Sequence, residues 1–306
     1  MHKSVLLDEC ISYLNLTEEK KIVDCTLGYA GHSSRILKEI KRGFLFAFDQ
    51  DKEAISSSKN ILSKIGNNFE IIKSNFVYLK KELNNRKIDK VDGFLFDLGV
   101  SSPQLDEDYR GFSFHKDAIL DMRMDTDKEL SAKKVVNEYS IEELTNIFYK
   151  YGEEKYAKSI AKGIINYREN KEIETTLELV EIIKNSVPEK YKRDKHPARK
   201  VFQAIRIEVN DELKVFEIAL YDALEMLNVN GRICVITFHS LEDKICKRIF
   251  SEKTKIKNEL KRMPVIPEEF IPKYKLIANT APTKKELLEN TRARSSRVRV
   301  IEKIKQ

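Results

Sequence analysis

Acidic, glycine and histidine residues follow apolar segments at four places in this 306-residue sequence, where they could bind a ligand or move a proton. These places are the Gly28-x-x-Gly31 turn, Asp49, Asp97 and His239. Each follows a short apolar run of the kind that predicts a buried strand. The carboxyl ends of parallel strands meet at one edge of a sheet, where ligands bind. We therefore expect these groups to converge on one site.

The first of these places is a strand, a glycine turn and a helix, predicted between Lys21 and Ile40. Such a turn brings backbone N–H groups close to a ligand. Its spacing differs from the G-x-G-x-x-G dinucleotide fingerprint, which disfavours an NAD(P) oxidoreductase. Asp49 follows about twenty residues later, where a carboxylate can accept hydrogen bonds from ribose hydroxyls. Asp49 or Asp51 could also cap the next helix; we assign Asp49 to the ligand and Asp51 to the cap.

The later strands end in groups that suit a reaction as well as binding. Phe76 follows a strand at 69–72, and its ring could pack against a purine or belong to the core. Asp97 ends the next strand and could contact a cofactor, a reacting amino group, or both. His239 could act as a general base, or it could shape its loop through a hydrogen bond to Glu242 or Asp243.

Strands and helices alternate up to Asp97 and resume near residue 200, which predicts a Rossmann-like, doubly wound α/β sheet. Between them we find no strong strand candidate. Two capping boxes, Ser140–Glu143 and Thr175–Glu178, precede apolar residues at helical spacing and predict an inserted all-helical domain. The predicted sheet domain is discontinuous and covers 1–108 and 200–306, with the insert at 109–199. After the insert we expect a long helix at 201–227 and two strands at 233–238 and 298–301.

The composition favours a protein with a polyanionic partner. The net charge is +7, and basic residues cluster at 188–200 and again at 292–299. Such clusters fit phosphate contacts, although each could also be a solvated face. Four scattered cysteines without a CxxC motif predict buried thiols, and five histidines without metal-ligand spacing predict no metal site. The apolar runs are too short to span a bilayer and the N-terminus lacks a signal peptide, so we expect a cytoplasmic location.

Longer motifs along nearly the whole chain resemble the RsmH (MraW) family. They are, in order, GHSSRIL, DGFLFDLGVSSPQLD, RGFSF, LDMRMD, YGEEKYAKSIA, FQAIRIEVNDEL, TFHSLED and TRARSSRVR. Members of this family are S-adenosylmethionine-dependent methyltransferases that modify N4 of a cytidine in the decoding region of bacterial 16S ribosomal RNA. The resemblance therefore implies a class I methyltransferase sheet with an inserted helical domain.

The resemblance also implies which residues contact the cofactor. The family usually has glycine where this chain has Ala30, and alanine would be strained there if its φ were positive. The chain also departs from the family at Thr291, Arg199 and Lys200, on the expected RNA side. The implied S-adenosylmethionine contacts are Ala30, Gly31, His32, Asp49, Phe76, Asp97 and Gln104.

Methylation of a cytosine amino group requires alignment and electrostatic support more than a covalent intermediate. Asp97 and His239 are the candidate catalytic residues, with Ser101, Ser102 and Asn210 as weaker candidates. The base must leave its stack to react. Aromatic residues could stack on it, although Phe112 and Phe114 could instead anchor their loop. The predicted RNA contacts are Tyr109, Phe112, Phe114, Arg199, Lys200, Arg292 and Arg294.

The expected partner is 16S ribosomal RNA within the small ribosomal subunit, bound through its phosphates. The sequence leaves open whether the chain forms a homodimer. It also leaves open a different class of function, a ribosome-assembly RNA-binding protein with a vestigial cofactor site.

Overall fold

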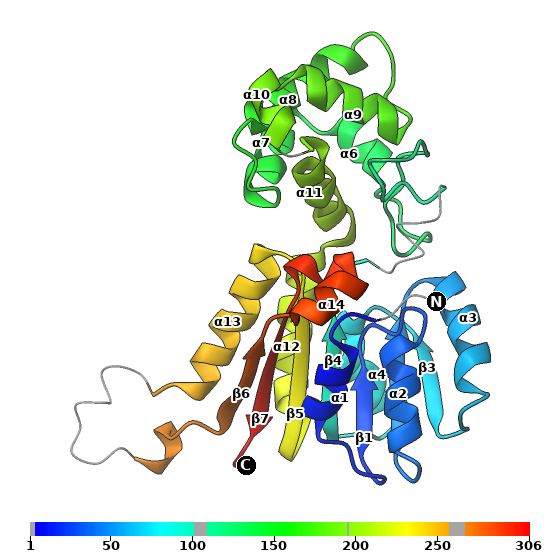
Figure 1. The fold of residues 1–306 in the computed structure, drawn as a ribbon, viewed down its shortest axis with the longest axis vertical. Helices are drawn as coiled ribbons and strands as arrows, with labels where there is room; N and C mark the ends of the chain where they lie inside the picture. Colours follow the sequence, from blue (N-terminus) through cyan, green and yellow to red (C-terminus); the bar gives the residue numbers. More distant parts are fainter. Residues whose placement is uncertain (1–3, 101–108, 195, 257–266) are drawn as a thin grey trace. The chain divides into compact units, whose positions relative to one another are not determined.

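The computed structural model describes residues 4–100, 109–194, 196–256 and 267–306 (Figure 1). The chain divides into two compact units. We call residues 1–99 and 213–306 the sheet unit, and residues 100–212 the helical unit. The predicted boundary between residues 199 and 200 falls inside α11 (Ala198–Asn210), whose apolar residues belong to the core of the helical unit. Residues 200–212 therefore belong with the helices and not with the sheet, contrary to our expectation.

The described part of the sheet unit contains a seven-stranded sheet in the order β3-β2-β1-β4-β5-β7-β6. The first five strands are parallel, and β7 runs antiparallel to both of its neighbours. This is the doubly wound class I sheet that the sequence predicts; β6 was missed. The strands are β1 (Lys21–Asp24), β2 (Phe44–Asp49), β3 (Phe69–Lys73), β4 (Val91–Asp97), β5 (Leu227–Thr237), β6 (Tyr274–Thr280) and β7 (Arg297–Lys303).

Helices cover both faces of the sheet because successive strand residues point to opposite sides. In β4, Leu95 packs in one apolar cluster, whereas Phe94 and Phe96 pack in the other. Leu95 shares its cluster with α1 (Leu7–Leu14), α2 (Gly31–Glu39) and α3 (Lys52–Leu62). The opposite cluster includes α4 (Leu79–Asn85), α12 (Glu212–Met226) and α13 (Ser240–Thr254).

Shorter elements complete the sheet unit. They are the 3₁₀ helices η1 (Phe76–Tyr78), η3 (Glu268–Phe270) and η4 (Thr291–Ser295), and the helix α14 (Lys284–Glu289).

The helical unit has its own core. Its buried residues include Leu144 and Phe148 from one helix, Ile160 from a second and Phe202 from a third. Both predicted capping boxes are confirmed: Ser140 and Thr175 cap their helices with reciprocal bonds from Glu143 and Glu178. The helices are α6 (Ala132–Glu138), α7 (Ile141–Lys150), α8 (Ala157–Arg168), α9 (Thr176–Asn185), α10 (Glu189–Asp194) and α11.

The single long helix predicted at 201–227 is wrong. Asp211 adopts a left-handed conformation with φ 53°, which ends α11 at Asn210 before α12 begins at Glu212. Strand β5 starts at Leu227, six residues earlier than the strand predicted from residue 233. The apolar stripe therefore continues across a break that hydrophobic periodicity alone does not reveal.

The cysteine prediction is confirmed, because Cys10, Cys25, Cys234 and Cys246 are all buried and form no disulfide. Among the described residues, no helix combines the length and the apolar character needed to cross a membrane.

Candidate functional site

The carboxyl ends of the parallel strands bring the predicted site residues of the sheet unit to one edge. Strands β1, β2, β4 and β5 end there at Asp24, Asp49, Asp97 and Thr237. Strand β7 begins at the same edge, because Arg297 pairs with Thr237 in antiparallel register. The four strand-end groups predicted from the sequence thus lie on the side of the sheet where ligands bind in this class of fold.

In the glycine turn between β1 and α2, Ala30 has the positive φ that strains an alanine backbone. Ala30 is fully buried and left-handed, with φ 59°, and the partly buried Gly28 is also left-handed, with φ 49°. A non-glycine residue in this conformation costs about 1–2 kcal/mol. Gly31 begins α2, and a Cβ on it would lie 1.8 Å from the Ser4 hydroxyl oxygen. A side chain at residue 31 would therefore require Ser4 to move.

Asp49 organises this turn through its carboxylate. Oδ2 accepts the Gly28 N–H at 2.8 Å, and Oδ1 accepts the Asp51 N–H at 2.9 Å. A carboxylate can accept about four hydrogen bonds, so Asp49 can still accept one from a ligand hydroxyl. Burial raises the pKa of Asp49 to about 6, against the effect of hydrogen bonds from the backbones of Asp51, Gly28 and Gln50. The prediction for Asp51 is confirmed: it caps α3, and its side chain accepts the Glu53 N–H at 3.0 Å.

His32 and Asp97 face each other across the turn. His32 Nδ1 lies 3.4 Å from Asp97 Oδ2, and the His32 ring is almost fully buried. Burial lowers the pKa of His32 to about 4, so the ring is neutral at physiological pH. Burial also raises the pKa of Asp97 well above its usual value, and the negative charges of Asp24 and Glu242 add to this effect.

Two buried polar atoms at this position have no hydrogen-bond partner among the described residues: His32 Nε2 and Asp97 Oδ1. Buried polar atoms are normally paired, so unpaired ones mark a place where a ligand can bind. Three acids close together also favour a cation, because positive charge would stabilise their ionised forms. S-adenosylmethionine carries positive charge on its sulfonium and its amino group, and the residues present fit it.

A buried network that the sequence analysis missed supports Asp97. Asp24 is fully buried and accepts the Ser33 hydroxyl at 2.6 Å and the Thr26 N–H at 3.1 Å. Thr26 Oγ1 in turn accepts the Asp97 N–H at 2.8 Å. The available signal was an acid inside the apolar IVDC segment, since acids are seldom fully buried without partners.

Phe76 begins η1 beside the end of β3. Its ring is partly buried and meets Phe96 edge to face at 5.9 Å. Asn75 caps η1 by accepting the Val77 N–H, and it donates to Gln50 Oε1 at 3.0 Å. The loops after β2 and β3 are thereby joined, and Phe76 is held at the carboxyl edge with part of its ring exposed.

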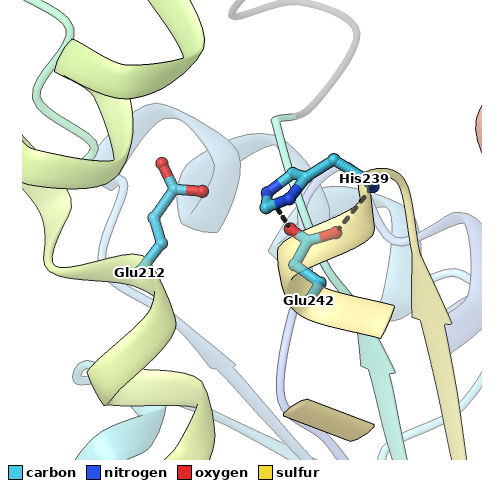
Figure 2. Close-up of side chains that lie close together, drawn as sticks. All are labelled: Glu212, His239 and Glu242. Atoms are coloured by element: carbon cyan, nitrogen blue, oxygen red, sulfur yellow. Dashed lines mark hydrogen bonds and ion pairs between the residues drawn. The ribbon is translucent and has the colours of Figure 1, made fainter. Parts of the chain in front are cut away.

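His239 lies at the start of α13, where Glu242 holds it (Figure 2). His239 Nε2 is 3.1 Å from Glu242 Oε1, and Glu242 Oε2 accepts the Phe238 N–H at 2.7 Å. Both ring nitrogens of His239 are nevertheless buried without a hydrogen-bond partner among the described residues, so both proposed roles of His239 stay predictions. Glu212, also drawn in Figure 2, forms a bidentate ion pair with Arg206 within the helical unit.

The arginine-rich tail separates into two parts. Arg294 lies exposed on η4, and Arg292 is partly exposed on the same turn. Arg299 is only 8% exposed and forms a bidentate pair with Asp243 at 2.7 and 3.0 Å. The idea that the whole tail contacts phosphates is therefore wrong for Arg299, whose charge is already neutralised inside the sheet unit.

The predicted aromatic contacts of the helical unit differ in exposure. Tyr109 is 57% exposed, whereas Phe112 is only 6% exposed and belongs to the core. Phe112 cannot stack on a base without leaving that core, which corrects the prediction. Phe114 is partly buried, and its ring stacks on His196 with centroids 4.7 Å apart.

Arg199 is exposed, while Lys200 donates to the Glu153 carbonyl at 2.6 Å. Asn210 is buried and structural: it accepts the Met124 N–H and donates to the Met122 carbonyl, both at 2.8 Å. Three further candidates, Ser101, Ser102 and Gln104, lie outside the described residues.

Comparison with known proteins identifies the family of this chain. The model of the MraW methylase family matches residues 1–304. The chain is 51% identical to the ribosomal RNA small subunit methyltransferase H of Exiguobacterium sibiricum, over 100% of this chain and 99% of that protein.

Two solved structures match this chain at low similarity. An rRNA methylase from Streptococcus thermophilus matches with a TM-score of 0.47 and 12% identity, over 100% of this chain and 99% of that one. A putative methyltransferase from Streptococcus mutans in complex with SAH matches with a TM-score of 0.46 and 12% identity, over 99% of each chain. The family model and the relative at 51% identity match nearly the whole chain at much higher similarity than these two structures. On the basis of those two sequence matches, this chain belongs to the MraW methylase family, whose members use S-adenosylmethionine.

Proposed function

We propose that this protein transfers a methyl group from S-adenosylmethionine to N4 of a decoding-region cytidine in small-subunit ribosomal RNA. The observation that carries the proposal is the full-length identity of 51% to a ribosomal RNA small subunit methyltransferase H. The N4 position follows from the family resemblance of the motifs that surround Asp97 and His239. The arrangement of the carboxyl edge supports a methyl donor of this kind.

Seven residues are assigned to the cofactor. The Gly31 N–H lies at the start of α2, Ala30 closes the turn by donating its own N–H to the Leu27 carbonyl, and Asp49 offers its carboxylate to ribose hydroxyls. The partly buried ring of Phe76 keeps some exposed surface for a purine. His32 and Asp97 present the unpaired buried atoms described above. When bound, the cofactor supplies an activated methyl group on a sulfonium. The set is Ala30, Gly31, His32, Asp49, Phe76, Asp97 and Gln104.

Asp97 has the chemistry to serve the acceptor amine as well as the cofactor. A carboxylate that accepts a hydrogen bond from the amino group localises its lone pair and later helps the nitrogen to lose a proton. A carboxyl group whose pKa is raised holds such a proton readily. His239 remains a candidate for the same proton, and its contact with Glu242 supports a positioning role.

The helical unit and the η4 segment are assigned to the RNA. Tyr109 offers an exposed ring for stacking, and Arg199 and Arg294 offer exposed guanidinium groups to phosphates. Phosphate contacts fix the register of an RNA, whereas base contacts select the nucleotide. Selection of one cytidine therefore depends on the residues around Asp97 more than on the basic clusters.

The test is a methyl-transfer assay on small ribosomal subunits from cells that lack this protein. Purified protein and S-adenosylmethionine should produce N4-methylcytidine at one decoding-region position, detected by mass spectrometry of RNA fragments. Calorimetry on the same preparation measures cofactor binding separately. Cofactor binding without any methyl transfer to subunits or to naked RNA would contradict the proposal and favour an assembly factor with a vestigial site.

A further inference from the structure

A buried carboxylate near the C-terminus holds the N-terminal segment of the sheet unit. Glu286 in α14 is 7% exposed, and its Oε1 accepts the Leu6 N–H at 2.6 Å. The two residues are 280 positions apart in the sequence. The second oxygen, Oε2, is buried without a hydrogen-bond partner among the described residues. Such a carboxylate costs free energy to bury, so its contact with Leu6 needs an explanation.

Helix capping does not explain the direction of this side chain. Thr283 caps α14 by accepting the Glu286 N–H at 3.2 Å, which places Glu286 three residues after the cap. A glutamate at this position commonly turns back to the N–H of the capping residue. Glu286 instead reaches a backbone group of a distant segment, and it fixes that segment rather than its own helix.

The segment that Glu286 fixes is a wall of the glycine turn. Ser4 fills the space next to Gly31, because a Cβ on that glycine would lie 1.8 Å from the Ser4 hydroxyl. The Val5 backbone forms a hydrogen bond with His32. This bond raises the pKa of His32, whereas the larger effect of burial lowers it. Leu6 is fully buried in the same apolar cluster as Ala30. Residues 4–6 thus pack against the three residues assigned to the cofactor from this turn.

The Leu6 backbone is itself held in a costly conformation. Its φ is 52° and it precedes α1 without a side-chain cap. A bulky residue in the left-handed region persists only where its surroundings determine it. The Glu286 carboxylate accepts the N–H of this strained residue. The hydrogen bond therefore helps to fix the position of residues 4–6.

We propose that Glu286 is a positioning residue of the cofactor site: its carboxylate holds residues 4–6 against Gly31 and His32 and so fixes the glycine turn in its binding conformation. The inference rests on the proposed assignment of this turn to S-adenosylmethionine. Glu286 itself does not contact the cofactor or the reacting atoms.

Two substitutions of similar volume separate the hydrogen bond from packing. Glu286→Gln keeps an oxygen that can accept the Leu6 N–H, whereas Glu286→Met fills the same space without an acceptor. Loss of one buried hydrogen bond should raise the Kd and KM for S-adenosylmethionine about tenfold in the Met variant. The Gln variant should stay within about threefold of the wild type, because a neutral acceptor is weaker than a carboxylate. At saturating cofactor, kcat should be unchanged in both.

The matched control is Glu289→Met, on the exposed side of the same helix, which should bind like the wild type. Circular dichroism and thermal unfolding establish that each variant is folded before binding is measured. A folded Met variant with wild-type Kd and KM would overturn the positioning role, and so would a Gln variant as impaired as the Met variant. Failure of the wild type itself to bind S-adenosylmethionine would instead contradict the proposed function.

Discussion

The carboxylate of Asp49 accepts the backbone N–H of Gly28 at 2.8 Å, so the residue at the end of β2 sets the shape of the turn after β1. The same side chain also accepts the Asp51 N–H. Asp49 therefore has two roles that a substitution removes together: it holds the turn, and it offers the remaining lone pairs to a ribose.

Asp49→Ala should weaken S-adenosylmethionine binding by about 1–3 kcal/mol, as for the loss of a buried hydrogen bond to a charged group. Titration calorimetry measures the change. Asp51→Asn is the matched control, because asparagine is also a good helix cap and should leave the affinity unchanged. Equal affinities for the Ala variant and the wild type would remove the ribose assignment.

The neutral, buried ring of His32 makes stability depend on pH. Its pKa is about 4 in the folded chain and about 6.5 when unfolded, so the unfolded state binds more protons between these values. Its contribution to stability is present above pH 6.5 and is lost as pH falls towards 4. As the pH falls from 6.5 to 4, the unfolding free energy of His32→Gln should therefore rise relative to that of the wild type by roughly 1 kcal/mol per pH unit.

Urea unfolding of both proteins between pH 7 and pH 4 measures this difference. Asp49 has the opposite effect, because its raised pKa of about 6 favours the folded state at low pH. Both proteins contain Asp49, so its contribution cancels in the comparison. Parallel stability curves for the two proteins would show that His32 titrates normally in the folded chain.

Two tail arginines should differ in what their removal affects. Arg294→Ala should lower RNA affinity and reduce the salt slope by about one, with cofactor affinity unchanged. Arg299→Ala should lower the unfolding free energy by about 2–3 kcal/mol, because it leaves Asp243 unpaired. Lys275→Ala removes one exposed charge from β6 and is the control for net charge. RNA binding that falls equally for Lys275→Ala and Arg294→Ala would indicate only a general charge effect.

A similar contrast applies to two aromatic residues of the helical unit. Tyr109→Ala should weaken RNA binding by about 1–3 kcal/mol, the usual contribution of one stacked base, without loss of stability. Phe112→Ala should destabilise the unit by about 3–5 kcal/mol, because it opens a cavity in the core. Filter binding and thermal unfolding separate these effects. Tyr149→Ala, at a tyrosine that is 71% exposed on α7, should change neither quantity.

The parts of the fold that the sequence predicts are those with strong local patterns. Apolar runs that end in Asp49 and Asp97 identify buried strands, and the capping boxes at Ser140 and Thr175 identify helix starts. Strand β6 was missed because it lies at the edge of the sheet, where Lys275 and Leu276 are exposed and no continuous apolar run forms. The break at Asp211 was missed because it changes one backbone angle and leaves the apolar spacing intact.

The parts of the site that the sequence did not reveal depend on pairs that are distant in the chain. Arg299 looks like its neighbours Arg294 and Arg297 until its pairing with Asp243 is known. Phe112 and Tyr109 are both aromatic residues near RGFSF, and only packing separates a core ring from an exposed one. Glu286 belongs to no recognisable motif, because its proposed role depends on a hydrogen bond to the distant Leu6 N–H.

Strand β7 lies between β5 and β6, although it follows every other strand of the sheet along the chain. During synthesis, the sheet unit therefore cannot acquire all of its strand pairs until the ribosome has passed Lys303. The helical unit is continuous from residue 100 to residue 212, so all its core residues emerge much earlier. Domains generally fold as units during translation. We expect the helical unit to fold first, while the β5 edge stays unpaired and vulnerable to aggregation until the last strand arrives.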